Sequence, residues 1–448
     1  MLGLILFGIV LMMLLVGFPV AFTLGGVSTL YGLATFGTQF FEFMPLRIWG
    51  VSTNILLIAV PLFVFMGVML ESSGLAEEML ETMALLFGRM RGGLAISVVV
   101  VGALLAASTG IVGATVVTMG LLSLPTMLKR GYSKPLATGT IAASGTLGQI
   151  IPPSIVLVLL GSVLNVPIGD LFMGALIPGL LLVVLYLVWI NIRAWWRPDV
   201  APPMPPEELA DFKGREMVIR VLRAFIAPLF LIVAVLGSIF AGIASPTEAA
   251  AVGAVGATLL TILQKKFNYK TLQRVMRETT FLTCMVFTIL VGASTFGLAF
   301  RGLHGDTFLQ ELVGHAELGP IAFLAIFMVV IFIAGFFIDF IEITFIHVPI
   351  AAPIFQAMGV DLLWVGVLIA LNLQTSFLTP PFGFSLFYLK GVAPPEVKTT
   401  DIYKGIVPFV AIQVIALAMV IMWPEMVTCL PEYIIRDVPV NELRCWSN

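Results

Sequence analysis

The stretch SGTLGQIIPPS, residues 144–154, interrupts an apolar, charge-free segment with two adjacent prolines. A second stretch, LQTSFLTPPFG at residues 373–383, repeats this pattern in the other half of the chain. The two breaks are 228 residues apart, and so are Pro125 and Pro353 upstream of them. Helix breakers at matching places in the apolar spans of a repeated membrane chain indicate a secondary transporter, with its site at the breaks.

The composition is that of a polytopic membrane protein. Of the 448 residues, 60% are hydrophobic and 11% are charged, whereas a soluble domain carries roughly 25% charged residues. Charge-free runs at 1–41, 92–128, 135–169 and 362–389 exceed the roughly 20 residues that one helical span needs. The N-terminus has no basic lead, so we interpret residues 2–16 as a retained span. The net charge of −2 argues against a nucleic-acid partner.

Clusters of Lys and Arg mark the cytoplasmic loops, and threading spans between them predicts two similar halves. The first half contains a hairpin at 92–128 and crossings near 2–16, 19–36, 53–71, 135–166 and 171–192. The second half contains a hairpin at 320–357 and crossings near 224–243, 247–264, 279–300, 362–389 and 406–423. Because five crossings per half is an odd number, the halves must lie upside down relative to each other.

We therefore predict an all-α polytopic membrane protein built from two inverted-topology repeats. Each repeat has about five spans, one re-entrant hairpin and one broken helix, an organisation typical of secondary transporters with inverted repeats. The expected divisions are a first repeat, a Pro-rich charged cytoplasmic linker, a second repeat and a periplasmic tail, at 1–194, 195–222, 223–428 and 429–448.

The charges at the hairpin bases support the inversion. The first hairpin is flanked only by cations, namely Arg89, Arg91, Lys129 and Arg130. The second is flanked by Glu311, His315, Glu317 and Asp361, without Lys or Arg. The first hairpin should thus open to the cytoplasm and the second to the outside. Charge alone leaves open whether each hairpin crosses fully or turns back, but the 37 residues at 92–128 favour a re-entrant turn.

Each hairpin has a polar tip, Ser108-Thr109-Gly110 in the first and Asp339 with Glu342 in the second. Unwound backbone at membrane depth must line a cavity or be buried in protein, and its carbonyl oxygens suit Na⁺. Half-helix N-termini favour an anionic substrate group. We expect substrate contacts at the breaks, from Gly148, Pro152, Pro153, Thr379, Pro380 and Pro381.

Purely structural roles are the alternative to these site assignments. Small polar residues often serve helix packing in membranes, whereas an acidic residue such as Asp339 inside a span is costly and usually functional. His347, on the apolar return arm of the second hairpin, either packs there or takes part in proton or substrate binding.

Several stretches resemble the large membrane subunit of tripartite ATP-independent periplasmic (TRAP) transporters. They are GTIAASGTLGQIIPPS, MLKRGYSKPLA, SPTEAAAVGA, GFFIDF followed by VPIAAPIFQAMGVDLLWVGV, and LNLQTSFLTPPFGFSLFYLKG. The resemblance covers nearly the whole chain. It implies a multi-pass Na⁺ symporter of the bacterial inner membrane that works by an elevator movement. It also implies two partners, a small four-helix membrane subunit and a periplasmic substrate-binding protein.

The resemblance further implies a set of Na⁺ ligands in each half. In the first half they are Ser108, Thr109, Gly110, Ser144, Gly145 and Thr146. In the second half they are Asp339, Asn372, Thr375 and Ser376. Glu342 departs from the family pattern, because a second acid follows Asp339 by three residues.

The functional prediction is a permease subunit that imports an organic acid together with Na⁺ and depends on a binding protein. The two hairpins and two broken helices would move past a static scaffold built from the remaining helices. The alternative is a binding-protein-independent carboxylate or ion transporter of the same superfamily, coupled to Na⁺ or H⁺. An enzyme is disfavoured because no span carries a nucleophile with a base or a metal cluster, and a channel remains a formal possibility.

The threading also places the C-terminal tail, with Cys429 and Cys445, outside the cytoplasm. Disulfides persist in that compartment, so the two cysteines are either bridged or free there. Cys284 lies alone within a predicted span.

Overall fold

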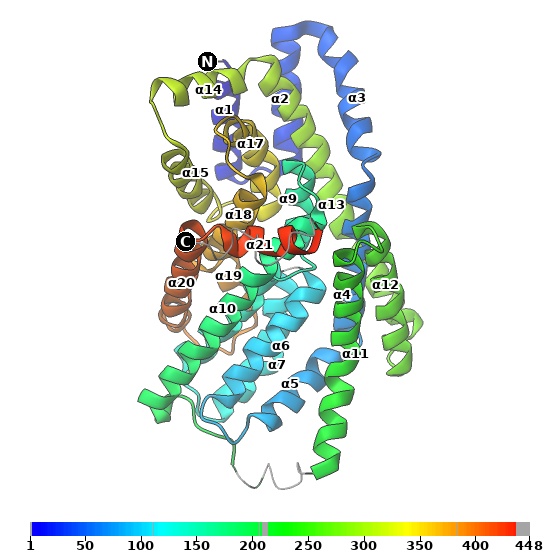
Figure 1. Cartoon of the computed structure of the whole chain (residues 1–448), viewed down its shortest axis with the longest axis vertical. Coiled ribbons are helices and arrows are strands. Elements are labelled where there is room, and N and C mark those ends of the chain that lie inside the picture. The colour runs from blue at the N-terminus through cyan, green and yellow to red at the C-terminus, as the bar shows by residue number, and fades with distance from the viewer. Residues whose placement is uncertain (1, 111, 206, 208–213, 382, 436–448) are drawn as a thin grey trace.

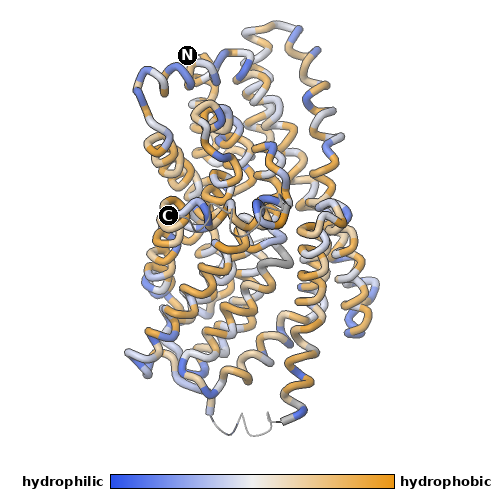
Figure 2. Tube along the Cα trace, viewed as in Figure 1, coloured by the Kyte–Doolittle hydropathy of each residue, from blue (hydrophilic) through white to orange (hydrophobic). Residues whose placement is uncertain are grey.

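The computed structural model describes residues 2–110, 112–205, 207, 214–381 and 383–435. Within these residues every regular element is a helix (Figure 1). Eight of the described helices are long and apolar enough to cross a membrane, or nine if the bent pair α16–α17 counts as one span. Figure 2 shows mostly apolar residues along the long helices, with hydrophilic residues at the two ends of the molecule and also at mid-height around α21. The prediction of an all-α polytopic membrane protein is confirmed.

The helices of the N-terminal half follow the predicted spans closely. They are α1 (Leu2–Val16), α2 (Val20–Phe36), η1 (Gly37–Gln39), α3 (Phe40–Ser52), η2 (Ile55–Ile58), α4 (Ala59–Ser72), α5 (Leu75–Leu86), α6 (Gly93–Thr109), α7 (Val112–Lys129), α8 (Lys134–Thr146), η3 (Leu147–Gln149), α9 (Ile155–Leu164), α10 (Ile168–Trp196) and η4 (Pro198–Val200). Helices α6 and α7 form the first hairpin, and the chain between α8 and α9 is the first break.

The C-terminal half has a similar order of helices, except that the single helix α13 takes the place of α3 and α4 and that α21 is added at the end. They are α11 (Gly214–Phe240), α12 (Pro246–Leu263), α13 (Tyr269–Gly302), α14 (Gly305–His315), α15 (Pro320–Ala334), α16 (Phe340–Ile346), α17 (Val348–Ala357), α18 (Leu362–Leu378), α19 (Phe384–Val392), α20 (Thr399–Met422) and α21 (Glu425–Ile435). Helices α15 to α17 form the second hairpin, and the chain between α18 and α19 is the second break.

Three helices were not expected from the sequence. Helix α3 carries Glu42, Pro45 and Arg47, which mark a loop by charge and proline, yet it continues from α2 through the turn η1. Helix α14 is a short amphipathic helix between α13 and the second hairpin, and α21 extends helical structure into the expected tail. The expected linker, 195–222, is helical at both ends, because α10 runs to Trp196 and α11 begins at Gly214.

The long helices pack as two groups. Group A consists of α2, α3, α4, α11, α12 and α13, in which α4 packs on α12 and α2 packs on α13. Group B consists of α6 to α10 and α15 to α20, in which α8 packs between α6, α7 and α20. The groups meet where α4 contacts α6 and α9, where α11 contacts α6 and α10, and where α13 contacts α16. Helices α10 and α20 therefore lie with the broken helices and not with the other uninterrupted spans.

The packing within group A repeats along the chain. A shift of 228 residues carries α2 onto α12 and α4 onto α13, and the contact α2–α13 recurs as α12–α4. Glycines permit both approaches: Gly25 lies against Gly292, and a Cβ on Gly253 would lie 2.6 Å from the Met66 sulfur. These glycines, Gly25 and Gly253, are themselves 228 residues apart.

The start of the linker lies under the first hairpin. The Gly92 N–H donates to the Ala201 carbonyl at 3.0 Å, and the Ser133 N–H donates to the Val200 carbonyl at 3.0 Å. These bonds place the linker at the hairpin end that carries Lys129 and Lys134, as expected if both lie on the cytoplasmic side.

Candidate functional site

The first break is a buried, non-helical turn between two short helices. Helix α8 ends at Thr146, η3 follows, and the Pro152–Pro153 peptide bond is cis. The Ser154 hydroxyl, at the start of α9, donates to the Gln149 carbonyl at 2.8 Å. Gly148, Pro152 and Pro153 are all buried within the turn. The N-terminus of α9 thus opens directly into the break.

The second break has the same construction. Helix α18 ends at Leu378, and the Pro380–Pro381 bond is also cis. The Thr379 hydroxyl donates to the Thr375 carbonyl at 2.7 Å, and the Ser385 hydroxyl, in the first turn of α19, donates to the Phe377 carbonyl at 3.0 Å. The chain crosses this break with its polar groups bonded to the end of α18.

The two breaks meet inside the protein. The Gln374 amide nitrogen donates to the Thr146 hydroxyl at 3.4 Å, and both side chains are buried. The two residues are 228 positions apart, so corresponding positions of the two halves contact each other. Residues that are far apart in sequence thereby form one polar centre.

Both helices of the first hairpin pack against the residues of the first break. A Cβ on Gly102 of α6 would lie 2.7 Å from the Ser144 Cβ, and Gly145 packs directly on Val116 of α7. At the tip, Gly110 has a φ of 61°, and a Cβ there would lie 3.1 Å from the Ile155 nitrogen. The tip therefore reaches the N-terminus of α9. The Ser108 and Thr109 side chains lie outside the described parts of the structure, so their ligand roles stay predictions.

The second hairpin holds the second break in the same way. The Asn372 amide donates to the Met328 carbonyl of α15 at 2.7 Å. Gly335, at the end of α15, packs directly on the Ser376 hydroxyl. The predicted residues Asn372, Thr375 and Ser376 are all buried in the last turns of α18.

The acids at the second tip form a capping box on α16. The Asp339 carboxylate accepts the Phe340 N–H at 2.7 Å, and the Glu342 carboxylate accepts the Asp339 N–H at 2.8 Å. In such a box the two side chains satisfy amide groups that the helix cannot bond itself. Glu342, which departs from the family pattern, thus has a structural role in fixing the tip that carries Asp339.

Each hairpin also contacts the half-helix that follows the other break. A Cβ on Gly113 of α7 would lie 2.9 Å from the Tyr388 ring of α19, while α16 and α17 contact α9. The two hairpins and the half-helices α9 and α19 therefore contact one another across the two halves. A shift of one hairpin would change the contacts at both breaks.

The site offers oxygen atoms in a buried setting. The Ser144, Thr146, Thr375 and Ser376 hydroxyls each donate to a helix carbonyl at 2.8–3.0 Å. A hydroxyl that donates its proton keeps lone pairs with which to bind a cation. Together with carbonyls of the interrupted backbone, these are hard ligands of the type that Na⁺ accepts.

Gln149 is a candidate ligand that the sequence-based selection of site residues missed. Its side chain is fully buried in the first break, and neither its amide oxygen nor its nitrogen has a hydrogen-bond partner among the described residues. Buried polar groups are normally satisfied, so the amide is free to bind an ion or substrate. The sequence does contain a signal for this residue, because Gln149 is a single amide side chain between the end of a predicted helix and a double proline.

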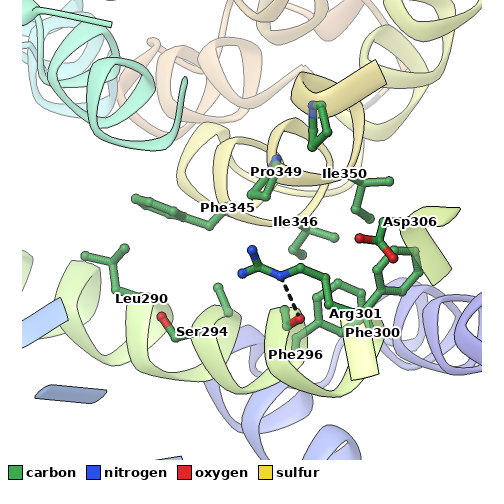
Figure 3. A pocket seen from close by; sticks show the side chains of 13 residues that line it. Leu290, Ser294, Phe296, Phe300, Arg301, Asp306, Phe345, Ile346, Pro349 and Ile350 are labelled. Atoms are coloured by element: carbon green, nitrogen blue, oxygen red, sulfur yellow. Dashed lines mark hydrogen bonds between the residues drawn. The ribbon is translucent and has the colours of Figure 1, made fainter. Parts of the chain in front are cut away.

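Two arginines line a cavity that was also not predicted. It has a volume of about 450 Å³ and lies between α3, α13, the end of α9 and the return arm α17. Arg47 comes from α3 and Arg301 from α13. Figure 3 shows the adjoining smaller cavity, where the Arg301 Nε donates to the Gly297 carbonyl and the guanidinium extends beneath Phe345 and Pro349. The larger, arginine-lined cavity lies on the boundary between groups A and B.

His347 lies away from both breaks, at the junction of α16 and α17. Its ring packs edge-on against Phe7 of α1, with ring centroids 5.6 Å apart, and it borders an apolar cavity between α1, α14 and α15. Its contacts are therefore apolar, and its buried Nδ1 has no hydrogen-bond partner among the described residues.

Comparison with known proteins identifies the family of the chain. The family described as "Tripartite ATP-independent periplasmic transporter, DctM component" matches residues 7–426. The C4-dicarboxylate TRAP transporter large permease protein DctM of Vibrio cholerae is 30% identical over 448 residues, covering 95% of this chain and 97% of the relative. The ectoine TRAP transporter large permease protein TeaC of Halomonas elongata is 30% identical over 426 residues, covering 95% and 97%.

Among solved structures, the YdaH transporter of Alcanivorax borkumensis superposes with a TM-score of 0.64, covering 93% of this chain and 98% of that one. At 14% sequence identity this similarity shows a shared fold. The curated relatives are permease subunits and not enzymes. Because one family model spans nearly the whole chain, this protein belongs to the DctM family, the large permease subunits of TRAP transporters.

Proposed function

We propose that this subunit imports an organic acid together with Na⁺ and works with a small membrane subunit and a periplasmic binding protein in the bacterial inner membrane. The observation that carries the proposal is the meeting of the two breaks at Gln374 and Thr146, with a hairpin packed on each. Substrates and ions of transporters with broken helices bind at such sites.

The ion sites are proposed at the two hairpin–break contacts. In the first half, Gly110, Ser144, Gly145 and Thr146 are candidate ligands, with Ser108 and Thr109 expected at the tip. In the second half, the candidate ligands are Asp339, Asn372, Thr375 and Ser376. A cation bound here would lower the cost of burying a substrate carboxylate nearby, which couples the two binding events.

The substrate is proposed to lie between the breaks, near Gly148, Pro152, Pro153, Thr379, Pro380 and Pro381. The N-termini of α9 and α19 begin there, and helix N-termini stabilise anions. Arg47 and Arg301 would attract an organic anion to the cavity at the group boundary. A C4-dicarboxylate, named for the Vibrio relative, is one acid of this class.

The moving part is proposed to be group B as a whole. The sequence alone predicts that only the hairpins and broken helices move, past all remaining helices. However, α20 packs along α8, and Tyr186 of α10 accepts a hydrogen bond from Gln413 of α20 at 2.8 Å. Helices α10 and α20 would therefore travel with the broken helices, past a scaffold formed by group A.

The inverted repeat is proposed to underlie this movement. The contacts α2–α13 and α12–α4 correspond under the 228-residue shift, and basic residues concentrate at the end of the first hairpin but not of the second. The two halves would then open the site alternately to opposite sides of the membrane.

Reconstituted transport tests the function. The chain is co-purified with its small subunit, placed in liposomes, and supplied with its binding protein loaded with radiolabelled substrate. We expect uptake only with an inward Na⁺ gradient and only with the binding protein present. Uptake of free substrate without the binding protein would favour the alternative carrier, and uptake driven equally by K⁺ would refute Na⁺ coupling.

A further inference from the structure

A second polar cavity lies far from the breaks, at the end of the molecule where α10 ends and α20 begins. It has a volume of about 440 Å³, and its wall comes from the segment before α8, the last turns of α10 and the first turns of α20. Three cationic side chains line it, Arg193, Arg197 and Lys404, and the wall contains no carboxylate side chain. Two guanidinium groups and an ammonium group around one cavity match an anion with several oxygens, such as a phosphate.

Tryptophans place this cavity at the membrane surface. Trp189 lines it, and Trp195 and Trp196, one to two turns further along α10, are 75% and 68% exposed. Trp is enriched where the hydrocarbon core meets the headgroup layer. The cations of the cavity thus lie at the depth of lipid headgroups.

An apolar stripe begins beside the cations. Val184, Val188, Ile192 and Trp195 follow one face of α10, and each side chain is at least 39% exposed. Trp189, Arg193 and Arg197 are spaced four residues apart on the neighbouring face, and Arg193 is three residues from the exposed Trp196, which places the two side chains on the same side of the helix. On α20, Val407 is 61% exposed next to Lys404 and Pro408. A free phosphate would use only the cations, whereas a phospholipid would also contact the stripe with its acyl chain.

We propose that this cavity binds the headgroup of an anionic phospholipid. Arg193, Arg197 and Lys404 hold the phosphate, and the exposed stripe of α10 contacts an acyl chain. Basic pockets between membrane helices on the cytoplasmic side commonly hold such headgroups. Since α8, α10 and α20 all belong to group B, the lipid is bound to one helix group and does not bridge the two.

Native mass spectrometry of the chain, purified with its small subunit in uncharged detergent, tests the site. The probes are phosphatidylglycerol, phosphatidylcholine with the same acyl chains, and inorganic phosphate. We expect one saturable site that prefers phosphatidylglycerol over phosphatidylcholine by about tenfold or more, because each surface cation attracts an anionic lipid. The triple variant Arg193→Gln/Arg197→Gln/Lys404→Gln should lose that preference. Lys265→Gln/Lys266→Gln/Lys270→Gln removes as many cations from another loop and should keep it.

Three results would overturn the proposal. The triple variant could retain the preference, both triple variants could lose it equally through diffuse surface charge, or inorganic phosphate could compete as strongly as the lipid. If the triple variant does not fold, the same binding measurement on the single variant Lys404→Gln, at an exposed position, tests the proposal. It should weaken phosphatidylglycerol binding several-fold without lowering the thermal unfolding midpoint, and unchanged binding would contradict the proposal.

Discussion

Asp339 and Glu342 are two acids, three residues apart, with separable roles. Both cap α16, but only Asp339 is proposed to bind Na⁺. Asparagine caps a helix about as well as aspartate, and glutamine can replace glutamate in a capping box. Each amide variant therefore keeps the turn and removes only the charge.

We predict that Asp339→Asn raises the Na⁺ concentration for half-maximal uptake about tenfold, equivalent to about 1.4 kcal/mol, while Glu342→Gln changes it little. The measurement is initial uptake against Na⁺ concentration in liposomes. Equal effects of the two substitutions would mean that the acids act as one charged pair and that the assignment to Asp339 is wrong.

Replacing Gln149 should lower transport without lowering the stability of the protein. Its buried amide has no partner among the described residues, and replacing an unsatisfied polar group by an apolar one is neutral or stabilising. Gln149→Leu should therefore leave the thermal unfolding midpoint unchanged or higher, while uptake falls at least about tenfold. If Gln149→Leu transports normally, the amide binds neither ion nor substrate.

At the scale of elements, close helix contact defines group B. Gly139 of α8 and Gly405 of α20 pack backbone to backbone, so that a Cβ on either would overlap a main-chain carbonyl of the other helix. Small residues allow such approaches in membranes, where packing and not the hydrophobic effect joins helices.

Gly139→Val should consequently lower the stability by about 1–3 kcal/mol through overpacking, measured as a lower unfolding midpoint in detergent. Gly8→Val is the matched control, because nothing lies within 4 Å of a Cβ on Gly8. A Gly139→Val midpoint equal to that of the control would show that α8 and α20 separate easily.

The breaks, the hairpins and most spans could be predicted because prolines and charges mark them directly in the sequence. Helix α3 could not, because Glu42, Pro45 and Arg47 interrupt its apolar pattern. Helix α13 begins at Tyr269, ahead of the expected 279, since its first turns carry cations such as Arg274, which pairs with Glu278 at 3.8 Å. Such charges can be exposed on a helix as readily as in a loop.

The candidate site was predictable in its segments but not in all its side chains. Repetition and helix breakers indicated Ser144 to Thr146 and Asn372 to Ser376, and the structure brings Thr146 and Gln374 together. The capping role of Glu342, the unpaired Gln149 and the arginine-lined cavity depend on tertiary packing, which periodicity does not encode. The two alternatives for Cys429 and Cys445, a bridged pair or free thiols, both stay predictions, because Cys445 lies outside the described residues.

For the whole molecule, the charge distribution predicts which end faces the cytoplasm. In a variant with the native cysteines replaced, Lys270→Cys should react with an impermeant maleimide only after the cells are broken. Glu311→Cys, on α14 beyond the other end of the long helix α13, should react in intact cells with a permeable outer membrane. The same labelling pattern at both positions would contradict the assigned orientation.

The central claim is that group B moves past group A during transport, and one contact tests it directly. The Asn54 amide, at the end of group A before η2, donates to the Ser162 hydroxyl of α9 at 3.1 Å. A disulfide in Asn54→Cys/Ser162→Cys would tie the groups together. The control Gly120→Cys/Val392→Cys lies within group B, where a Cβ on Gly120 would be 2.8 Å from Val392.

The decisive measurement is Na⁺-driven uptake by both cross-linked variants, in a background without native cysteines, before and after reduction. The account predicts that the Asn54–Ser162 cross-link abolishes uptake until it is reduced, while the cross-link within group B leaves uptake intact. Undiminished uptake by fully cross-linked Asn54→Cys/Ser162→Cys would contradict movement between the groups.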